Sequence, residues 1–464
     1  MIFKKSTLKF TIPALLLVHL GLLANTMFTL WPEMVVYPYL LNNGYLLYKD
    51  IINPYPPLLA FLLSGFAGIF GYHPQPYQIL TWIVILFIDL LIFFTNLKLS
   101  KNFKWATLSL SFFVLISLQL GINGLWFDLV QTPLIILAFY NFYLFLSNRK
   151  TINLNFSLLL LLIALLIKQQ TVWLLLWFSA VIIYTKRYKL KNFIKGLIPA
   201  FFTILLVYGV LIAYFIKLKT YQEFLFWTIT FPFAKASSMP GYILLPTLKQ
   251  LAVVVSLFFL TSSLVFRKNS FQNFAYFTAV VLLLFAYPRF DYFHLIPSLS
   301  MIAIGLGSGI SKKLSESLVI KALVVLTSIY LIIFSGRYFK NNWQIETRFF
   351  EPRILASAKI ISQLPTSEIY IQNAPQQLLP LSNKLPIKPW ATEFPWYLEK
   401  TGLQDEIVLS LKHQNPTYIV FEPYLQGNKF DLGTYQPEKI VNYIDSNYKI
   451  ITKIQDELWL KVEN

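Results

Sequence analysis

The sequence predicts a mainly α-helical protein with many membrane-spanning helices, followed by a small α/β domain. Hydrophobic residues make up 56% of the 464-residue chain, charged residues only 13%, and the mean hydropathy is +0.59. A soluble protein of this size needs a more highly charged surface. Long apolar runs recur as far as Arg337, and mixed strand and helix patterns follow them. These observations make the lipid bilayer the main solvent of the first part.

Short basic loops separate the apolar runs. Cytoplasmic loops of membrane proteins are rich in Lys and Arg, so an even number of spans must separate each basic loop from the next. This parity predicts about eleven spans of roughly 20 residues each. The predicted spans are 8–28, 77–97, 105–122, 127–147, 154–168, 170–185, 196–216, 243–266, 273–288, 293–311 and 318–336, and the basic loops are Lys98–Lys104, Arg149–Lys150, Lys186–Lys195, Arg267–Lys268 and Lys312–Lys313.

The same parity predicts a multi-pass protein of the cell membrane with a cytoplasmic N-terminus. The chain after Arg337 is then extracytoplasmic. The net charge of +18 does not indicate nucleic-acid binding, because the basic residues lie in short loops and not on one face. The chain has no cysteine, which excludes disulfides and thiolate chemistry, and its four histidines do not form a metal-ligand spacing.

Two domains are predicted, a transmembrane domain over residues 1–339 and a soluble extracytoplasmic α/β domain over residues 340–464. The second domain has a balanced charge. Its segments "EIYIQ", "PTYIVFE" and "YKIITKI…ELWLKV" have the pattern of strands, and "DEIVLSLKHQ" and "PEKIVNYIDSN" have the pattern of helices. Strands that alternate with helices are typical of a small α/β domain.

The first external loop, from Thr29 to about Tyr77, is long for a polytopic protein. Its apolar stretch "PPLLAFLLSGFAGIFG", residues 56–71, is too short for a span and would break the parity. We expect it to form an interfacial helix lying along the membrane. Pro56 and Pro57 suit the first turn of such a helix.

Acidic residues are rare before the C-terminal domain and are sorted by the predicted topology. All but two of them fall on or near the external side, which indicates a functional site there, since ionisable groups at a membrane boundary are costly. Asp89 is expected inside a span, facing the protein interior with a polar partner. The acids of this part are Glu33, Asp50, Asp89, Asp128, Glu223, Asp291 and Glu316.

The stretches "LWPEMVVYPYLLNNG" and "YLLYKDIINPYPPLLAFLLSGFAGIFG" resemble the first external loop of GT-C superfamily glycosyltransferases. Protein O-mannosyltransferases and lipid A aminoarabinose transferases are the nearest types. Four further stretches resemble later parts of this family in the same order. They are "GLWFDLVQTPLIILAFY", "LLIKQQTVWLLLW", "EFLFWTITFPFA" and "AYPRFDYFHLIPSL". The resemblance covers roughly residues 8–340, but the Asp-Glu pair frequent in the family is reduced here to Glu33 after Pro32.

The resemblance implies transfer of a sugar from a polyprenyl-phosphate carrier to an extracytoplasmic acceptor, with inversion, in cell-envelope glycosylation. The acceptor stays open between protein, lipid and glycan, and so does the use of a divalent metal. This chemistry needs a carboxylate that takes the acceptor proton. It also needs cations that hold the phosphate leaving group.

The catalytic candidates are Glu33 as general base, Asp50 as its partner or a sugar ligand, and Asp128. The alternatives are an ion pair between Asp50 and Lys49, and a placement of Asp128 by the helix dipole alone. The substrate-binding candidates are polar residues for the phosphate and aromatic residues for the sugar, although most aromatic residues belong to interfacial belts. They are Tyr37, Tyr48, Lys168, Gln169, Arg289, Asp291 and His294.

Three other functions remain open at this stage. The main alternative is a transporter or flippase of a polyprenyl-linked or lipid substrate. Such proteins place charges near the midplane and carry internal repeats. The others are a GT-C-like ligase or polymerase and an inactive scaffold whose C-terminal domain binds a partner.

Overall fold

The structure is a computed structural model that describes residues 5–184, 190–265, 270–306, 318–392, 394–424, 435–455 and 458–463. The chain divides into two compact units. We call Met1–Phe28, Gln78–Gly209 and Leu244–Glu346 the bundle unit. We call Thr29–Tyr77, Val210–Ile243 and Thr347–Asn464 the mixed unit. The predicted basic loops at 267–268 and 312–313 lie outside the described residues.

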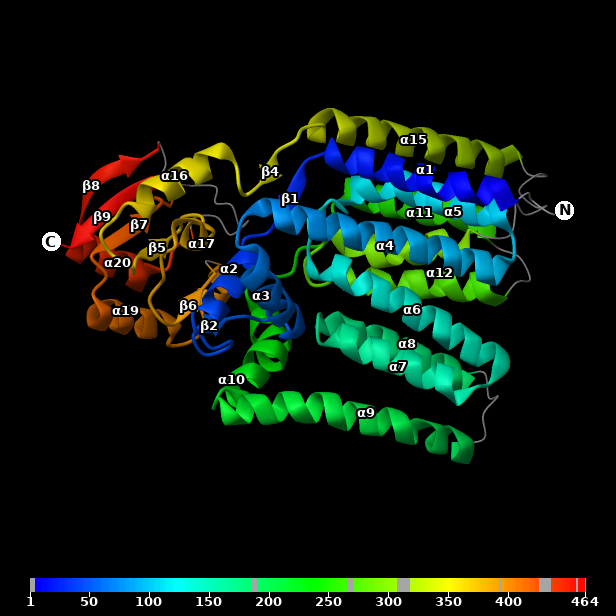
Figure 1. The fold of residues 1–464 in the computed structure, drawn as a ribbon, viewed down its shortest axis with the longest axis horizontal. Helices are drawn as coiled ribbons and strands as arrows, with labels where there is room; N and C mark the ends of the chain where they lie inside the picture. Colours follow the sequence, from blue (N-terminus) through cyan, green and yellow to red (C-terminus); the bar gives the residue numbers. More distant parts are fainter. Residues whose placement is uncertain are drawn as a thin grey trace. The chain divides into compact units, whose positions relative to one another are not determined.

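The bundle unit consists of helices that run side by side (Figure 1). Its helices are α1 Lys5–Ala24, α4 Pro74–Ser100, α5 Phe103–Ser117, α6 Phe127–Asn148, α7 Thr151–Leu165, α8 Val172–Tyr184, α9 Leu190–Lys217, α11 Leu248–Val265, α12 Ser270–Leu282, α13 Ile296–Gly305 and α15 Leu318–Asn342. The first residues of α4 and the last residues of α9 belong to the mixed unit. Short elements join them, namely η1 Leu118–Leu120, β3 Gly124–Leu125, η2 Gln169–Thr171, η5 Leu283–Ala286 and η6 Tyr292–Leu295.

Four helices of the described residues are long and apolar enough to cross a membrane, by length and composition. They lie at Pro74–Ser100, Phe103–Leu120, Phe127–Asn148 and Lys321–Asn342, where the sequence predicts spans. Shorter apolar helices cover the other predicted spans. A mainly helical architecture with several apolar helices is therefore confirmed, while the count of about eleven spans stays a prediction.

Small polar side chains join neighbouring helices of the bundle unit. The Ser157 hydroxyl of α7 donates to the Ala138 carbonyl of α6 (2.9 Å), and the Ser298 hydroxyl of α13 donates to the Ala279 carbonyl of α12 (2.8 Å). Both serines are fully buried. Small residues let helices approach closely, and such hydrogen bonds tie helices together where water is absent.

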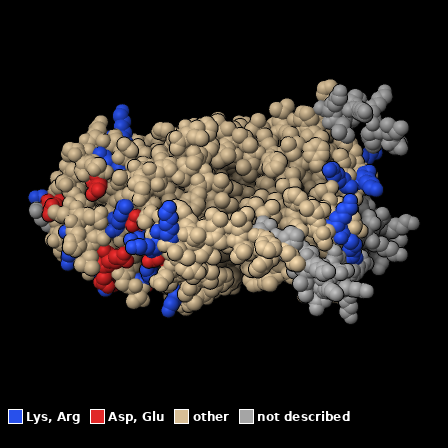
Figure 2. All heavy atoms as spheres, turned by 60° about the horizontal axis from the view of Figure 1, so that its bottom comes forward, with Lys and Arg blue, Asp and Glu red and all other residues tan. Residues whose placement is uncertain are grey.

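The basic loops between α4 and α5 and between α6 and α7 lie at one end of the bundle unit (Figure 1). They carry Lys98, Lys101, Lys104, Arg149 and Lys150. On the face shown in Figure 2, the flanks of the helices are almost free of charged side chains, and Lys and Arg gather near one end of the bundle unit. This distribution suits helices whose flanks face lipid.

Asp89 lies in the middle of α4 and is fully buried. Its Oδ2 is 2.7 Å from Nδ1 of His19 on α1, which is also fully buried. The expectation that Asp89 faces the interior and finds a partner is confirmed. Because the pair joins α1 to α4 where water is absent, each residue compensates the polar group of the other.

The mixed unit combines helices, short strands and a π-helix. The first external loop contributes β1 Phe28–Leu30, α2 Glu33–Asn42, β2 Ile51–Ile52 and α3 Leu58–Phe70. The first residue of β1 is the last residue of a bundle-unit segment. From the middle of the chain come α10 Tyr221–Leu225, the π-helix η3 Phe226–Lys235 and η4 Ala236–Ser238. The C-terminal part adds β4 Thr347–Arg348, α16 Pro352–Ser362, β5 Tyr370–Gln372, α17 Leu378–Ser382, β6 Trp390–Ala391, α18 Pro395–Leu398, α19 Leu403–Gln414, β7 Tyr418–Phe421, α20 Glu438–Asn447, β8 Tyr448–Ile454 and β9 Leu458–Glu463.

A four-stranded sheet forms the centre of the C-terminal part, in the order β5-β7-β9-β8. β5 and β7 are parallel, with Ile371 opposite Val420, while β9 is antiparallel to both β7 and β8. The strands and the helices α19 and α20 fall on the segments that the sequence predicts. α3 likewise occupies the segment predicted as an interfacial helix.

The first external loop and the C-terminal part are joined in the mixed unit by a two-stranded parallel sheet. Ile51 of β2 pairs with Trp390 of β6, and the Trp390 N–H donates to the Asp50 carbonyl (2.7 Å). The sequence predicted a domain boundary after residue 339. A boundary between the units falls close to it, after Glu346, yet the compact unit that contains the C-terminal part also takes in 29–77 and 210–243.

Candidate functional site

Glu33 is the first residue of α2, directly after Pro32. Glu33 is only 7% exposed, and its Oε2 is buried without a hydrogen-bond partner among the described residues. Burial raises the pKa of Glu33 from 4.5 to about 7, against the opposing effect of its own backbone N–H. A carboxyl group with a pKa near neutrality is suited to take up a proton at physiological pH. The residue placed first by the sequence is therefore a buried carboxyl group that exchanges a proton near neutral pH.

Three tyrosines share the surroundings of Glu33. Tyr37 follows it by one helical turn, so both side chains project from one face of α2. Burial raises the pKa of Tyr37 well above its usual value, and the charge of Glu33 adds to this effect, followed by those of Tyr55 and Tyr48. Burial also raises the pKa of Tyr397 on α18, with smaller effects of Tyr55, Tyr37 and Glu33. We call Glu33, Tyr37, Tyr55 and Tyr397 the Glu33 cluster.

Two aromatic residues of the π-helix η3 contact this cluster. The rings of Trp227 and Phe231 lie 4.9 Å apart, and the Tyr397 ring lies 6.2 Å from the first and 5.7 Å from the second. Trp227 and Phe231 are each 1% exposed. π-Helical segments are rare and are frequent at functional sites. η3 thus supplies an apolar wall against Tyr397.

Asp50 joins the first external loop to the C-terminal part. Its Oδ2 accepts hydrogen bonds from the Leu46 N–H (2.9 Å) and from Nζ of Lys388 (3.1 Å). Nζ of Lys388 also lies 4.2 Å from the centre of the Tyr45 ring. The ion pair of Asp50 is therefore with Lys388 and not with Lys49, the neighbour considered from the sequence. These contacts give Asp50 a supporting role in the fold of the loop.

Tyr48 also supports the loop. It is 1% exposed, and its ring packs against Phe215 and Phe224, each at 5.2 Å. Its hydroxyl donates to the Tyr55 carbonyl (2.9 Å). Its backbone has φ of 73°, a region that a non-glycine residue adopts only when its surroundings hold it there. Tyr48 thus fixes the backbone that carries Tyr55.

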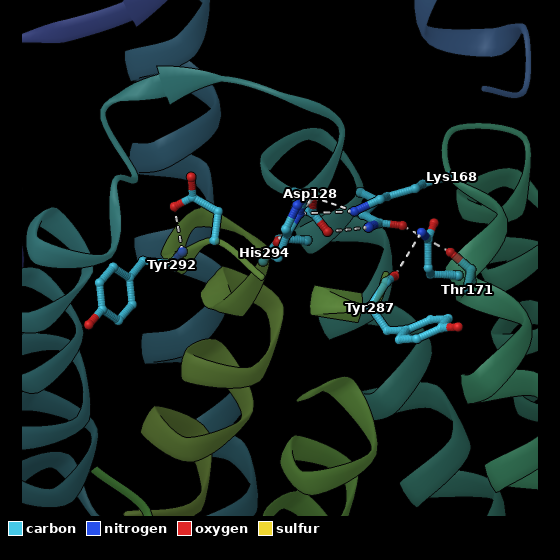
Figure 3. A network of polar contacts seen from close by, with 10 residues as sticks. Asp128, Lys168, Thr171, Tyr287, Tyr292 and His294 are labelled. Carbon is cyan, nitrogen blue, oxygen red and sulfur yellow. Dashed lines mark hydrogen bonds and ion pairs between the residues drawn. The ribbon is translucent and has the colours of Figure 1, made fainter. Parts of the chain in front are cut away.

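A second polar cluster lies in the bundle unit and is built on Asp128 (Figure 3). Asp128 occupies the first turn of α6, where the helix dipole favours an anion. Its Oδ2 is 2.7 Å from Nζ of Lys168, in the turn before η2, and 2.7 Å from Nδ1 of His294, on η6. Asp128 is fully buried, Lys168 is 1% exposed, and the His294 side chain is 12% exposed. The structure thus brings three predicted site residues together.

The geometry also assigns the proton of the His294 ring. Nδ1 lies 2.7 Å from the carboxylate oxygen of Asp128, and two acceptors at this distance would repel each other. Nδ1 therefore carries hydrogen and donates to Asp128. The Lys168 ammonium group also donates to Asp128, and its Nζ lies 3.1 Å from Nδ1. Nε2 of a neutral ring is then an acceptor, and protonation turns it into a donor.

Two further side chains hold Asp128 in place. Nε2 of Gln131, one turn along α6, donates to Oδ1 of Asp128 (3.2 Å). The Thr171 hydroxyl on η2 donates to Oε1 of Gln131 (2.9 Å). Both Gln131 and Thr171 are fully buried. We call Asp128, Lys168, His294, Gln131 and Thr171 the Asp128 cluster.

The other predicted residues of this region lie on the turns next to the Asp128 cluster. Gln169 is half-buried at the start of η2, and Arg289 is half-buried beside a short bridge to Leu244. Asp291 is exposed, and its Oδ1 accepts a hydrogen bond from the Tyr292 N–H (2.6 Å) at the start of η6 (Figure 3). Of the residues predicted between 289 and 294, His294 is the one that contacts Asp128.

Sequence reasoning missed Gln131, Thr171, Tyr397 and Lys388. Gln131 lies three residues after Asp128 and was detectable by helical spacing. The other three are brought into place by contacts between segments far apart in the chain, for which the single sequence contains no signal. Among the described residues there is no group of three or more His, Asp or Glu side chains placed to hold a metal ion.

Together these features define a polytopic helical membrane protein with a mixed α/β unit. Among solved structures, the chain is similar to the arabinofuranosyltransferase AftD from mycobacteria, with a TM-score of 0.55 at 10% sequence identity. The alignment covers 100% of this chain and 42% of AftD, so the chain spans less than half the length of that protein. No family model and no curated protein matches the sequence. At this identity the likeness concerns the fold alone.

Proposed function

We propose that the protein is an integral membrane glycosyltransferase that transfers a sugar from a polyprenyl-phosphate donor to a hydroxyl acceptor outside the cytoplasm. The likeness of the fold to the glycosyltransferase AftD supports the general class, and the donor, the acceptor side and the base are proposed here. In the reaction, the acceptor oxygen attacks the anomeric carbon as the bond to the phosphate oxygen breaks. The acceptor proton passes to Glu33, and the polyprenyl phosphate leaves with the bonding electrons. One such displacement inverts the anomeric centre.

The state of the Glu33 carboxyl group carries this proposal. A solvated loop acid would be ionised and fully hydrated, and would be a weak base at neutral pH. Glu33 is instead buried, has an unpartnered Oε2 and has a pKa of about 7. A base with this pKa is half unprotonated at pH 7 and binds the abstracted proton strongly, which is the combination that general base catalysis requires.

Within the bundle unit, the Asp128 cluster holds candidate residues for binding a phosphate group. Nζ of Lys168 is an N–H donor in a buried setting, where a charge-assisted hydrogen bond to phosphate is strong, and Nε2 of His294 would be a second donor when its ring is protonated. Asp128 accepts hydrogen bonds from both, so it acts as the positioning residue of the two donors and not as a second base.

The test uses the purified full-length protein in lipid nanodiscs and a panel of polyprenyl-phosphate-linked pentoses and hexoses. Released polyprenyl phosphate is measured for the wild type, for Glu33→Gln and for Asp405→Asn, whose carboxylate is exposed and paired with Lys439. We expect Glu33→Gln to lose about 10²- to 10⁴-fold in kcat, the contribution of a general base. Asp405→Asn should match the wild type.

Two results would contradict the proposal. Turnover by Glu33→Gln at the wild-type rate would remove the base assignment. A wild type that releases no polyprenyl phosphate from any donor, but moves a fluorescent polyprenyl-linked lipid across vesicles, would favour the transporter.

A further inference from the structure

The His294 ring lies at the open side of the Asp128 cluster. Its side chain is 12% exposed, whereas those of Lys168 and Asp128 are 2% and 1% exposed. Nδ1 faces Asp128 and Lys168, and Nε2 has no hydrogen-bond partner among the described residues. An imidazole that is held by a carboxylate at one nitrogen and open at the other is suited to exchange a proton at the open nitrogen. Nε2 is therefore available to a ligand.

A chain of hydrogen bonds keeps the ring in this orientation (Figure 3). The Thr171 hydroxyl donates to Oε1 of Gln131 (2.9 Å), which leaves the amide nitrogen of Gln131 to donate to Oδ1 of Asp128 (3.2 Å). With Oδ1 occupied in this way, Asp128 presents Oδ2 to Nδ1 of His294 at 2.7 Å. Nδ1 carries hydrogen in both the neutral and the charged ring, so this contact holds in either state.

The charges of the cluster are balanced when the ring is neutral. Oδ2 of Asp128 is 2.7 Å from Nζ of Lys168 and 2.7 Å from Nδ1 of His294, so one carboxylate serves two donors. Nζ of Lys168 lies only 3.1 Å from Nδ1. A second cation at this distance would be repelled by the first and would leave a buried net charge. The unliganded cluster therefore favours a neutral His294.

The surroundings of η6 contribute little further charge. α13, η1 and η5 pack against η6 and carry no titratable side chain, and α6 contributes Asp128. η6 itself carries the phenol of Tyr292, and the turn before it carries Arg289 and Asp291, which have opposite charges. The protonation of His294 is therefore governed by Asp128, by Lys168 and by the charge that a ligand adds.

A phosphomonoester is the kind of ligand that reverses the charge balance. It carries about −1.5 to −2 charges at pH 7 and has three strong acceptor oxygens. Lys168 alone cannot compensate this charge, because Asp128 already neutralises it. An anion next to the ring favours the imidazolium form, whose Nε2–H is a charge-assisted donor to a phosphate oxygen.

We propose that a phosphomonoester bound at the Asp128 cluster is accompanied by the uptake of one proton at Nε2 of His294. This inference rests on the phosphate role proposed above and deepens it. The proton comes from the solvent, Nδ1 keeps its hydrogen on Asp128, and no covalent bond of the ligand changes. A phosphodiester donor carries one charge fewer than the monoester that leaves, so the charged ring favours the leaving group over the donor.

The experiment measures phosphate binding and proton uptake together, without turnover. Farnesyl phosphate is titrated calorimetrically into the full-length protein in nanodiscs at pH 7.5, in buffers of different ionisation enthalpy. The dependence of the heat on the buffer gives the number of protons. Inorganic phosphate is titrated in the same way, and the tighter of the two ligands shows whether the phosphate belongs to a lipid or is free. Methyl farnesyl phosphate, a diester, should bind about tenfold more weakly than farnesyl phosphate.

Two variants locate the proton. His294→Gln keeps an amide that can donate to Asp128 but cannot become charged, and His413→Gln is the matched control, because His413 is exposed on α19. We expect the wild type and the control to take up roughly 0.5 to 1 proton per farnesyl phosphate bound, and His294→Gln less than about 0.2. His294→Gln should also bind about tenfold more weakly, the effect of one lost charge-assisted hydrogen bond.

Nitrogen NMR of the wild type gives a reading that needs no variant. The protein is labelled with ¹⁵N-histidine, and exposed histidine rings are mostly neutral at pH 7.5. Farnesyl phosphate should convert one histidine ring from the neutral to the doubly protonated form, and His413→Gln should show the same change. A wild-type spectrum in which no ring gains a proton would overturn the inference even if His294→Gln does not fold.

The outcomes separate this inference from the proposed function. If farnesyl phosphate binds without proton uptake, or with equal uptake in His294→Gln, the coupling is wrong while the phosphate role of Lys168 stands. Equal affinity of the monoester and the diester would likewise contradict the charged ring. If Lys168→Met binds farnesyl phosphate as tightly as the wild type, the phosphate role fails and the coupling fails with it. Undiminished turnover by Glu33→Gln would refute the base assignment alone and leave the coupling intact.

Discussion

The unusual ionisation of Glu33 predicts how the stability of the protein depends on pH. The pKa of Glu33 rises from 4.5 to about 7 on folding, because burial disfavours the charged form. A pKa difference of one corresponds to about 1.36 kcal/mol, so the free energy of unfolding should fall by about 3 kcal/mol across this interval. Because the folded pKa is the higher one, this stability is fully present below pH 4.5 and is lost as the pH rises through 7.

Replacement by Gln removes the titration and keeps the shape. The Glu33→Gln protein should therefore lack the part of the pH dependence that Glu33 contributes, and above pH 7 it should be more stable than the wild type by about 3 kcal/mol. The side chain is 7% exposed, so solvent screening reduces this figure only slightly. Catalysis should change in the opposite sense, with kcat/KM of the wild type rising as Glu33 loses its proton near pH 7.

Two measurements check this reasoning. Denaturant unfolding in micelles at several pH values between 4.5 and 8 gives the stability difference between the two proteins. Infrared difference titration follows the carbonyl band of a protonated carboxyl group, which should disappear near pH 7 in the wild type and be missing in Glu33→Gln. A band that titrates near 4.5, or equal pH dependence of stability in both proteins, would refute the burial argument.

Three further predictions concern the ion pairs. Lys168→Met leaves Asp128 buried without its main partner and should destabilise the protein by about 3–5 kcal/mol. Adding Asp128→Leu should recover part of this loss of stability. If the costs of the two substitutions simply add in a double-mutant cycle, the two residues are not coupled and the prediction is wrong. For the pair in the bundle, His19→Phe should be destabilising and the double variant with Asp89→Leu less so, as measured by thermal unfolding in nanodiscs. Lys388→Met removes a partner that is 43% exposed, so it should cost less than about 1 kcal/mol and leave transfer intact; lost transfer would show that the Asp50 pair matters for catalysis.

The first external loop shows how much of the structure can be predicted from the sequence. "LWPEMVV" and "NPYPPLLAFLL" indicated an acid after the first span and a short apolar helix, and α2 and α3 form at these places. The rarity of acids before residue 340 singled out Glu33 and Asp128, because an uncompensated acid near a membrane is costly. The sequence could not decide that Glu33 is buried, since burial depends on how segments far apart in the chain pack together.

Asp50 and His294 show the same limit. From the sequence, Asp50 had Lys49 as an obvious neighbour, and His294 had Asp291 three residues away. In the structure Asp50 pairs with Lys388, and His294 contacts Asp128, 166 residues earlier in the chain. Local spacing predicts helical neighbours but is silent on pairs that only chain folding brings together.

The sequence by itself determined the helical membrane architecture, because apolar runs and the placement of basic loops respond directly to the bilayer. It also determined which acids are chemically costly. The tertiary structure decided which of these acids is buried with an unpartnered oxygen and which is held by hydrogen-bond donors. Burial without a partner raises the pKa of Glu33. By contrast, Lys388 and the Leu46 N–H occupy Oδ2 of Asp50, while Lys168 and His294 occupy Oδ2 of Asp128. The difference lies in desolvation and hydrogen bonding, which depend on distant segments of the chain.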